Sequence, residues 1–84
     1  MQQNNTTGDI MQEVIKVIAE HLGVDEGKVK PESHLINDLD ADEFDIVELA
    51  IAIQKATGKT ISEEDEANVQ TVGDFIKLVE KENV

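Results

Sequence analysis

The sequence predicts an all-α domain, a four-helix bundle of three longer helices and one short helix with a long loop between the first and the second. Apolar residues recur at three- and four-residue steps in several segments, and glycines or capping residues separate those segments. No segment alternates apolar and polar residues as a half-buried strand does, and no internal repeat is visible. With 84 residues, the chain forms one domain at most.

The first helix is expected to begin near Asp9 and to end at Leu22, because Gly23 follows as a stop signal. Its apolar face consists of Ile10, Val14, Val17, Ile18 and Leu22. Residues 1–8 are mostly Gln, Asn and Thr, a composition that buries little. We therefore expect a disordered polar tail over residues 1–8 and a helical domain over residues 9–84.

Residues 24–41 are expected to form a long ordered loop, because no helical period survives there. The segment is interrupted by Gly27, Pro31, Ser33 and Asn37. Four apolar residues are expected to attach it to the core: Val29, Leu35, Ile36 and Leu39. Loops of this length inside small domains are uncommon and tend to be functional.

The second helix is expected from Asp42 or Glu43 to Thr57, closed by Gly58. Its apolar residues occupy more than one stripe, so it should contact other elements on more than one side. A short helix capped by Ser62 is expected over residues 62–67. The last helix should begin at a capping box formed by Thr71 and Asp74 and continue through Val79.

The composition restricts the classes of partner. There are 19 acidic residues against seven basic residues, all Lys, for a formal net charge of −12. This balance argues against nucleic acids and anionic membranes and favours proteins with surfaces rich in Lys and Arg. The absence of Cys excludes disulfides and thiol chemistry. Without a membrane-length apolar run or signal-peptide pattern, we expect a soluble, monomeric protein of the cytoplasm, with an organelle matrix left open.

Acidic residues are concentrated at the predicted start of the second helix. Six lie within the eleven residues 38–48, and no Lys occurs between Pro31 and Gln54. A helix N-terminus stabilises each nearby acid by about 0.3–1 kcal/mol, which explains part of the cluster. The number of acids and the adjacent apolar residues also fit a docking surface with an apolar centre and a charged rim.

A calcium loop is a poor interpretation of this cluster, although Asp38, Asp40 and Asp42 alternate like its first three ligands. The sixth position, which needs Gly, is Glu43, and the twelfth, which needs a bidentate Glu, is Leu49. No dedicated metal site is therefore expected.

Enzymatic activity is not expected either. His21 and His34 are isolated in the sequence and are interpreted as surface or loop-packing residues. Ser33 precedes His34, but sequence adjacency alone does not make a nucleophile with an oriented base. A chain this short also provides little structure from which to form a catalytic cleft.

Residues 38–49, Asp-Leu-Asp-Ala-Asp-Glu-Phe-Asp-Ile-Val-Glu-Leu, resemble the signature of acyl carrier proteins. Further similar segments follow in the same order and spacing, among them Leu22-Gly23-Val24 and Thr71-Val72-Gly73-Asp74. The resemblance covers residues 10–79. It implies a helical carrier fold, phosphopantetheine as the family cofactor, and enzymes with basic docking surfaces as partners.

The resemblance places the attachment serine of the family at Glu43. A carboxylate at this position would form a mixed anhydride with the phosphate, and water cleaves such an anhydride. No cofactor is therefore expected on this chain as written. Neither Ser33 nor Thr57 is a plausible replacement for the attachment serine. Three interpretations of Glu43 stay open. In the first, Glu43 is a solvated acid in the first turn of the helix. In the second, its carboxylate supplies the single negative charge that a phosphodiester would supply. In the third, Glu43 is a substitution of a serine in this particular chain.

The resemblance also implies docking roles along the second helix. Charge contacts are expected from Asp42, Asp45 and Glu48, and apolar contacts from Phe44, Ile46, Val47 and Ile51. From the residues alone, Asp42 is equally a helix cap, and Val47 is more readily a core residue. Asp40 stands where the family commonly has Gly, and Gln54-Lys55-Ala56 replaces an acidic run, so the lower half of the surface is neutralised.

The function predicted from the sequence is a non-enzymatic docking or carrier module of fatty-acid, lipid or polyketide biosynthesis. One alternative is a regulatory or structural interaction protein that uses the fold without acyl chemistry. Another is a conventional acyl carrier whose serine was substituted in this chain.

Overall fold

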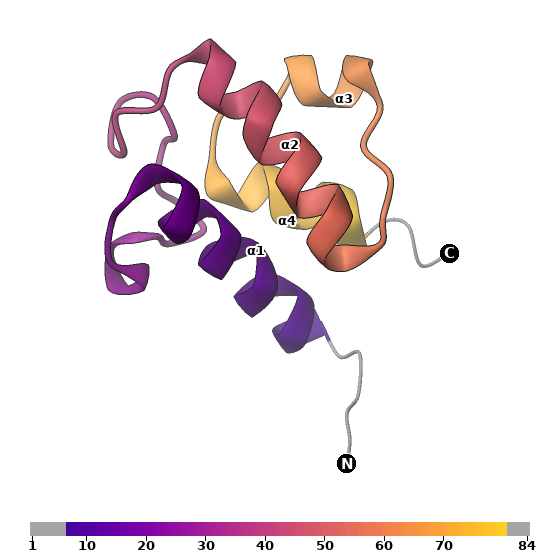
Figure 1. The fold of residues 1–84 in the computed structure, drawn as a ribbon, viewed down its shortest axis with the longest axis horizontal. Helices are drawn as coiled ribbons and strands as arrows, with labels where there is room; N and C mark the ends of the chain where they lie inside the picture. The colour runs from indigo at the N-terminus through magenta and orange to yellow at the C-terminus, as the bar shows by residue number, and fades with distance from the viewer. Residues whose placement is uncertain (1–6, 81–84) are drawn as a thin grey trace.

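The computed structural model describes the backbone of residues 7–80 and the side chains of residues 10–80, and over this part of the chain the fold is a helical bundle (Figure 1). Its elements are α1 (Thr7–Leu22), a 3-10 turn η1 (Glu26–Lys28), α2 (Glu43–Thr57), α3 (Glu63–Ala67) and α4 (Val72–Glu80). Helix α1 packs against α2 and α4, and α2 also contacts α3. The predicted all-α class, with three longer helices and one short helix, is confirmed, and α2 contacts neighbours on more than one side as expected.

Helix α1 begins at Thr7, two residues before the predicted start, and residues 1–6 of the predicted tail lie outside the described residues. It ends at Leu22, as predicted. Gly23 has a φ of 72°, a left-handed conformation that costs Gly little. The N–H groups of Gly23 and Val24 both donate to the carbonyl of Ala19, at 2.9 and 3.0 Å, and this cap closes the last turn.

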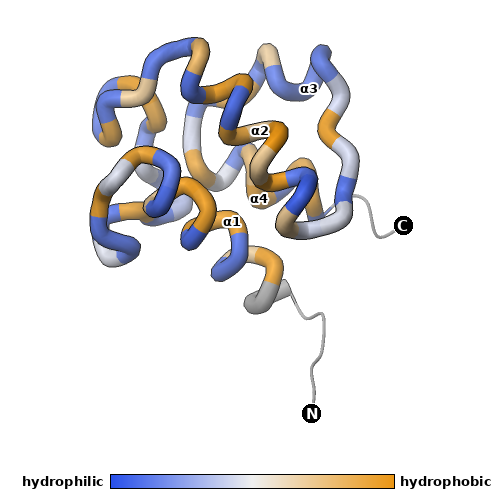
Figure 2. The backbone as a smooth tube through the Cα atoms, viewed as in Figure 1, coloured by the Kyte–Doolittle hydropathy of each residue, from blue (hydrophilic) through white to orange (hydrophobic). Residues whose placement is uncertain are grey.

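The core is formed by apolar side chains from every longer helix and from the loop before α2. Figure 2 shows hydrophobic residues along the backbone of α1, α2 and α4. Of the four loop residues expected in it, Val29, Leu35 and Leu39 are buried, but Ile36 is 45% exposed. The prediction for Ile36 was wrong because the chain turns tightly there. The N–H of Asp38 donates to the His34 carbonyl, and consecutive residues in such a turn cannot all face inward.

The loop before α2 is fixed to the start of α4 by backbone hydrogen bonds. Leu35 donates to the Gln70 carbonyl at 2.9 Å, and His34 and Thr71 form an isolated β-bridge. Val72 donates to the Ser33 carbonyl at 3.0 Å. The loop that leads into α2 is therefore ordered, as predicted, and holds the first turn of α2 in place.

The capping box predicted at the start of α4 is present. Thr71 N–H donates to Asp74 Oδ2 at 3.0 Å, and Asp74 N–H donates to Thr71 Oγ1 at 3.2 Å. Burial of the Asp74 carboxyl raises its pKa, but hydrogen bonds from the backbone of Gln70 and from Thr71, with the charge of nearby Lys77, lower it by more. The pKa of Asp74 therefore lies below its ordinary value, and the carboxylate that caps α4 is ionised at neutral pH.

Asp40 has a φ of 62°, which places a residue with a Cβ in the left-handed region. The backbone thus adopts here a conformation for which Gly is better suited. We expect Asp40→Gly to raise the free energy of unfolding by about 1 kcal/mol, measured by urea denaturation. The matched control is Glu32→Gly in the same loop, where φ is not positive, and it should lower stability. Equal effects of the two changes would contradict this account of Asp40.

Candidate docking surface

Helix α2 begins at a complete capping box. Asp45 N–H donates to Asp42 Oδ1 at 2.9 Å, and Asp42 N–H donates to Asp45 Oδ2 at 3.0 Å. These bonds satisfy backbone donors that a helix start leaves without partners, so the capping interpretation of Asp42 is confirmed. A substitution of Asp42 would therefore disturb the start of α2 as well as any contact with a partner.

The outward side of α2 carries three exposed apolar residues, which we call the apolar stripe: Phe44, Val47 and Ile51. Their exposed fractions are 73%, 43% and 50%. Their spacing of three and four residues puts them on one side of the helix. The interpretation of Val47 as a core residue was wrong, because other residues of α2 fill the core: Ile46, Leu49, Ala50 and Ile53.

Ile46, predicted among the docking residues, is only 8% exposed. Its side chain belongs to the core face of α2 and lies apart from the apolar stripe. The structure therefore brings together three of the four predicted apolar docking residues and separates the fourth from them.

Acidic side chains flank the stripe in the first half of α2. Glu43 is exposed and is the first residue of the helix, and the Glu48 side chain is 63% exposed one turn further on. The second half of α2 differs. Gln54 Oε1 accepts a hydrogen bond from Ile61 N–H at 2.9 Å, and Gln54 Nε2 donates to the Ala50 carbonyl at 3.1 Å, so this uncharged residue joins α2 to the chain that follows it.

His21, interpreted from the sequence as isolated, has acidic partners on α2. Its Nε2 atom lies 3.0 Å from Glu48 Oε1 and 3.9 Å from Asp45 Oδ1. No local pattern predicts these contacts, because 27 residues separate His21 from Glu48 and the packing of α1 on α2 brings them together. His34 is a loop-packing residue, as interpreted. Its Nδ1 accepts from Asn37 N–H at 3.1 Å.

The hydroxyl groups of Ser33 and Thr57 both form hydrogen bonds with the backbone. Ser33 is buried, and its Oγ donates to the Lys28 carbonyl and accepts from Lys30 N–H. Thr57 Oγ1 donates to the Ile53 carbonyl at 2.7 Å, at the far end of α2. Glu43 itself offers a carboxylate, which cannot form the stable phosphodiester that a hydroxyl forms.

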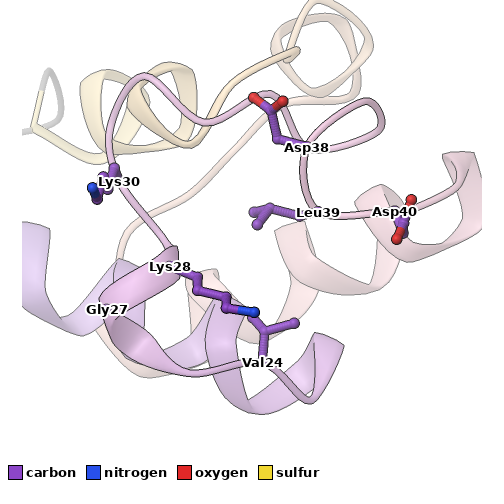
Figure 3. A pocket seen from close by; sticks show the side chains of 7 residues that line it. All are labelled: Val24, Gly27, Lys28, Lys30, Asp38, Leu39 and Asp40. Atoms are coloured by element: carbon purple, nitrogen blue, oxygen red, sulfur yellow. The ribbon is translucent and has the colours of Figure 1, made fainter.

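An open pocket of about 450 Å³ lies beside η1 and the 38–40 segment (Figure 3). Apart from Gly27, its lining consists of the apolar residues Val24 and Leu39 and four charged residues, Lys28, Lys30, Asp38 and Asp40. Such a mixed lining is unsuited to a fatty chain, which needs a mainly apolar wall. The residues predicted for docking do not line it.

The helical fold agrees with a comparison against protein families. Residues 12–79 match the model of the family described as phosphopantetheine attachment site. The chain therefore belongs to this family of carrier domains, and the family predicted from the sequence is confirmed. Within the described residues, none of the helices is long and apolar enough to cross a membrane.

Proposed function

We propose that this chain is a docking module of the acyl carrier type, which carrier-dependent enzymes of fatty-acid, lipid or polyketide biosynthesis bind through α2, and that as written it carries no phosphopantetheine. In this proposal the protein is a monomer without catalytic activity of its own. It acts in the cytoplasm or an organelle matrix. The observation on which the proposal rests is the apolar stripe on α2.

The core side of α2 is filled by other residues, so the apolar stripe is not needed for packing within the domain. Phe44 leaves 73% of its surface in water, although burial of such a side chain is worth about 1.5–3 kcal/mol. Grouped apolar residues beside charged ones are typical of a protein-binding surface, where the apolar centre supplies affinity and the charged rim supplies orientation. Nothing in the packing of α2 requires Phe44 to be apolar.

The charges indicate the chemistry of the partner. Glu43 and Glu48 are exposed beside the stripe, and the whole chain has a formal net charge of −12. A complementary partner surface presents Lys or Arg around an apolar depression. The second half of α2 contains Lys55 and no acidic residue, which favours partners that contact mainly the first half of the helix. Glu43 supplies a negative charge where the family has its phosphodiester, so a partner that recognises that charge can still bind.

The proposal is tested by the affinity for two carrier-dependent enzymes, a broad-specificity phosphopantetheinyl transferase and a fatty-acid ketosynthase. Phe44→Ala and Glu48→Lys should each weaken binding to at least one of them by tenfold or more, because the first removes the apolar anchor and the second reverses a rim charge. Fluorescence anisotropy at low and moderate salt measures the affinities, and binding should weaken as salt rises.

The matched control is Glu13→Lys, which makes the same charge change at an exposed position on α1. It should retain most of the affinity. Asp42→Lys is not suitable, because it would also remove the cap of α2. If Phe44→Ala and Glu48→Lys both bind as tightly as the unmodified chain, the α2 docking surface is refuted. If the unmodified chain binds neither enzyme, the role as an interaction protein without acyl chemistry becomes the better interpretation.

A further inference from the structure

Three side chains of the kinds that bind metal ions converge where the last turn of α1 meets the first half of α2. They are His21, Asp45 and Glu48, and one donor atom from each lies within 4.8 Å of the other two. The set combines an imidazole from one helix with two carboxylates from another. The three side chains are therefore brought together by the packing of α1 on α2, unlike a cluster of acids that are neighbours in the sequence.

The distances suit a small divalent ion. A tetrahedral Zn²⁺ with bonds of about 2.0–2.2 Å holds its ligand atoms about 3.3–3.6 Å apart. The two distances from His21 Nε2, 3.0 Å to Glu48 Oε1 and 3.9 Å to Asp45 Oδ1, lie on either side of that range. Binding of such an ion would therefore require side-chain rotation to bring both distances into that range. The side chains are 28%, 34% and 63% exposed, so water can reach the remaining coordination position.

Asp45 is oriented for such a role by the capping box. Its Oδ2 accepts the N–H of Asp42 at 3.0 Å, and its Oδ1 is the atom that faces His21. Hydrogen bonds of this kind fix the direction of a metal-binding carboxylate and strengthen its binding. His21 lies in the last turn of α1, where the helix dipole favours a cation, and the strongly acidic chain attracts cations in general.

We propose that His21, Asp45 and Glu48 form a binding site for a divalent transition metal, with Zn²⁺ as the best-suited ion. The imidazole nitrogen determines this choice. Mg²⁺ and Ca²⁺ prefer sites composed of oxygen ligands, whereas Zn²⁺ readily combines imidazole with carboxylates. The site is separate from the calcium-loop pattern of Asp38, Asp40 and Asp42, which was rejected on spacing.

The test is isothermal titration calorimetry of the full chain with ZnCl₂ in a buffer that does not chelate the metal. His21→Gln, which keeps a polar side chain able to hydrogen-bond Glu48, should weaken the tightest Zn²⁺ binding by at least tenfold. His34→Gln is the matched control, because the chain has only two His residues and His34 is in the loop. It should bind Zn²⁺ as the unmodified chain does. Ca²⁺ titrated into the unmodified chain should bind more weakly than Zn²⁺.

A second measurement needs no variant. Long-range ¹H–¹⁵N spectra of the unmodified chain should show the Nε2 resonance of His21 shifting on addition of one equivalent of Zn²⁺, with the ring nitrogens of His34 unchanged. The proposal is overturned if His21→Gln retains full Zn²⁺ affinity, if His34→Gln loses as much, or if the His21 resonances do not move. The first and third results would mean that Zn²⁺ binds through carboxylates without His21, and the second would mean that His34 takes part in the binding.

The site has a consequence for docking that rests on the proposed function. Zn²⁺ would engage Glu48, which is also a rim charge of the docking surface, so metal and enzyme should compete. Zn²⁺ should weaken binding of the transferase to the unmodified chain several-fold more than its binding to His21→Gln. If the unmodified chain binds neither the transferase nor the ketosynthase, the proposed function fails, while calorimetry and the His21 resonances still decide the metal site independently.

Discussion

Glu43→Ser is expected to gain one phosphopantetheine group when it is incubated with coenzyme A and a broad-specificity phosphopantetheinyl transferase, whereas the chain as written should gain none. The reason is chemical. A serine hydroxyl can form a stable phosphodiester, and the carboxylate of Glu43 cannot. The measurement is the intact mass of each protein after the reaction. We expect complete attachment of phosphopantetheine to Glu43→Ser and none to the chain as written, which is the largest effect expected from any single substitution.

A serine at position 43 should be compatible with the fold. Position 43 is exposed and is the first residue of α2, and the capping box of Asp42 and Asp45 does not involve its side chain. The loss of one acid near the helix N-terminus should cost about 0.3–1 kcal/mol, which leaves most of the stability of the domain in place. The scaffold presented to the transferase should therefore be unchanged.

Glu63→Ser is the matched control for this experiment. Glu63 is also an exposed first residue of a helix, follows a capping residue as Glu43 does, and belongs to α3. A serine there should gain no mass, because the transferase must recognise the surface around the serine as well as its hydroxyl. Modification of Glu63→Ser would show that any exposed serine at a helix start is accepted. If Glu43→Ser also stays unmodified, Asp40 and Gln54 become the next positions to restore, and the interaction-protein role gains support.

The helices could be predicted because their signals are local. Gly23 and Gly58 end helices in the left-handed conformation, and Ser62 and Thr71 accept hydrogen bonds from the first turns of α3 and α4. Each of these effects depends on residues within four positions of one another. These short-range signals therefore predicted the bounds of the four α-helices to within two residues in the part of the chain described, whereas the 3-10 turn η1 was not predicted.

The division of α2 into an inner and an outer face could not be predicted in the same way. Apolar residues lie all round this helix, so its periodicity does not show which side the core takes. Val47 and Ile46 are neighbours of similar character, yet one is 43% exposed and the other 8%. The choice depends on how α1 and α3 pack against α2, which is a property of the whole fold.

The contacts of His21 were missed for the same reason. An imidazole that meets two carboxylates more than 20 residues away leaves no trace in local spacing. The alternating acids at residues 38–42 are visible within one segment of the sequence, whereas a histidine from another helix is not part of any such segment. Contacts that form only through the packing of helices thus cannot be predicted from a single sequence.

Gly73→Ala is expected to lower the free energy of unfolding by about 2–3 kcal/mol, a large share of the roughly 3–5 kcal/mol that a core of this size supports. A Cβ at position 73 would lie 2.9 Å from the Pro31 carbonyl oxygen, which is closer than real Cβ atoms approach an oxygen. Gly73 N–H also donates to that same oxygen at 2.8 Å. The methyl group would push the loop before α2 away from α4 and weaken this bond.

Gly27→Ala is the control for the Gly73 substitution. A Cβ at position 27 would meet nothing within 4 Å, so its replacement should change stability by less than about 0.5 kcal/mol. Urea denaturation of the two variants measures the difference. If Gly73→Ala is as stable as Gly27→Ala, the loop can move away from α4 at little cost. The loop would then be less firmly held than its hydrogen bonds to residues 70–73 indicate.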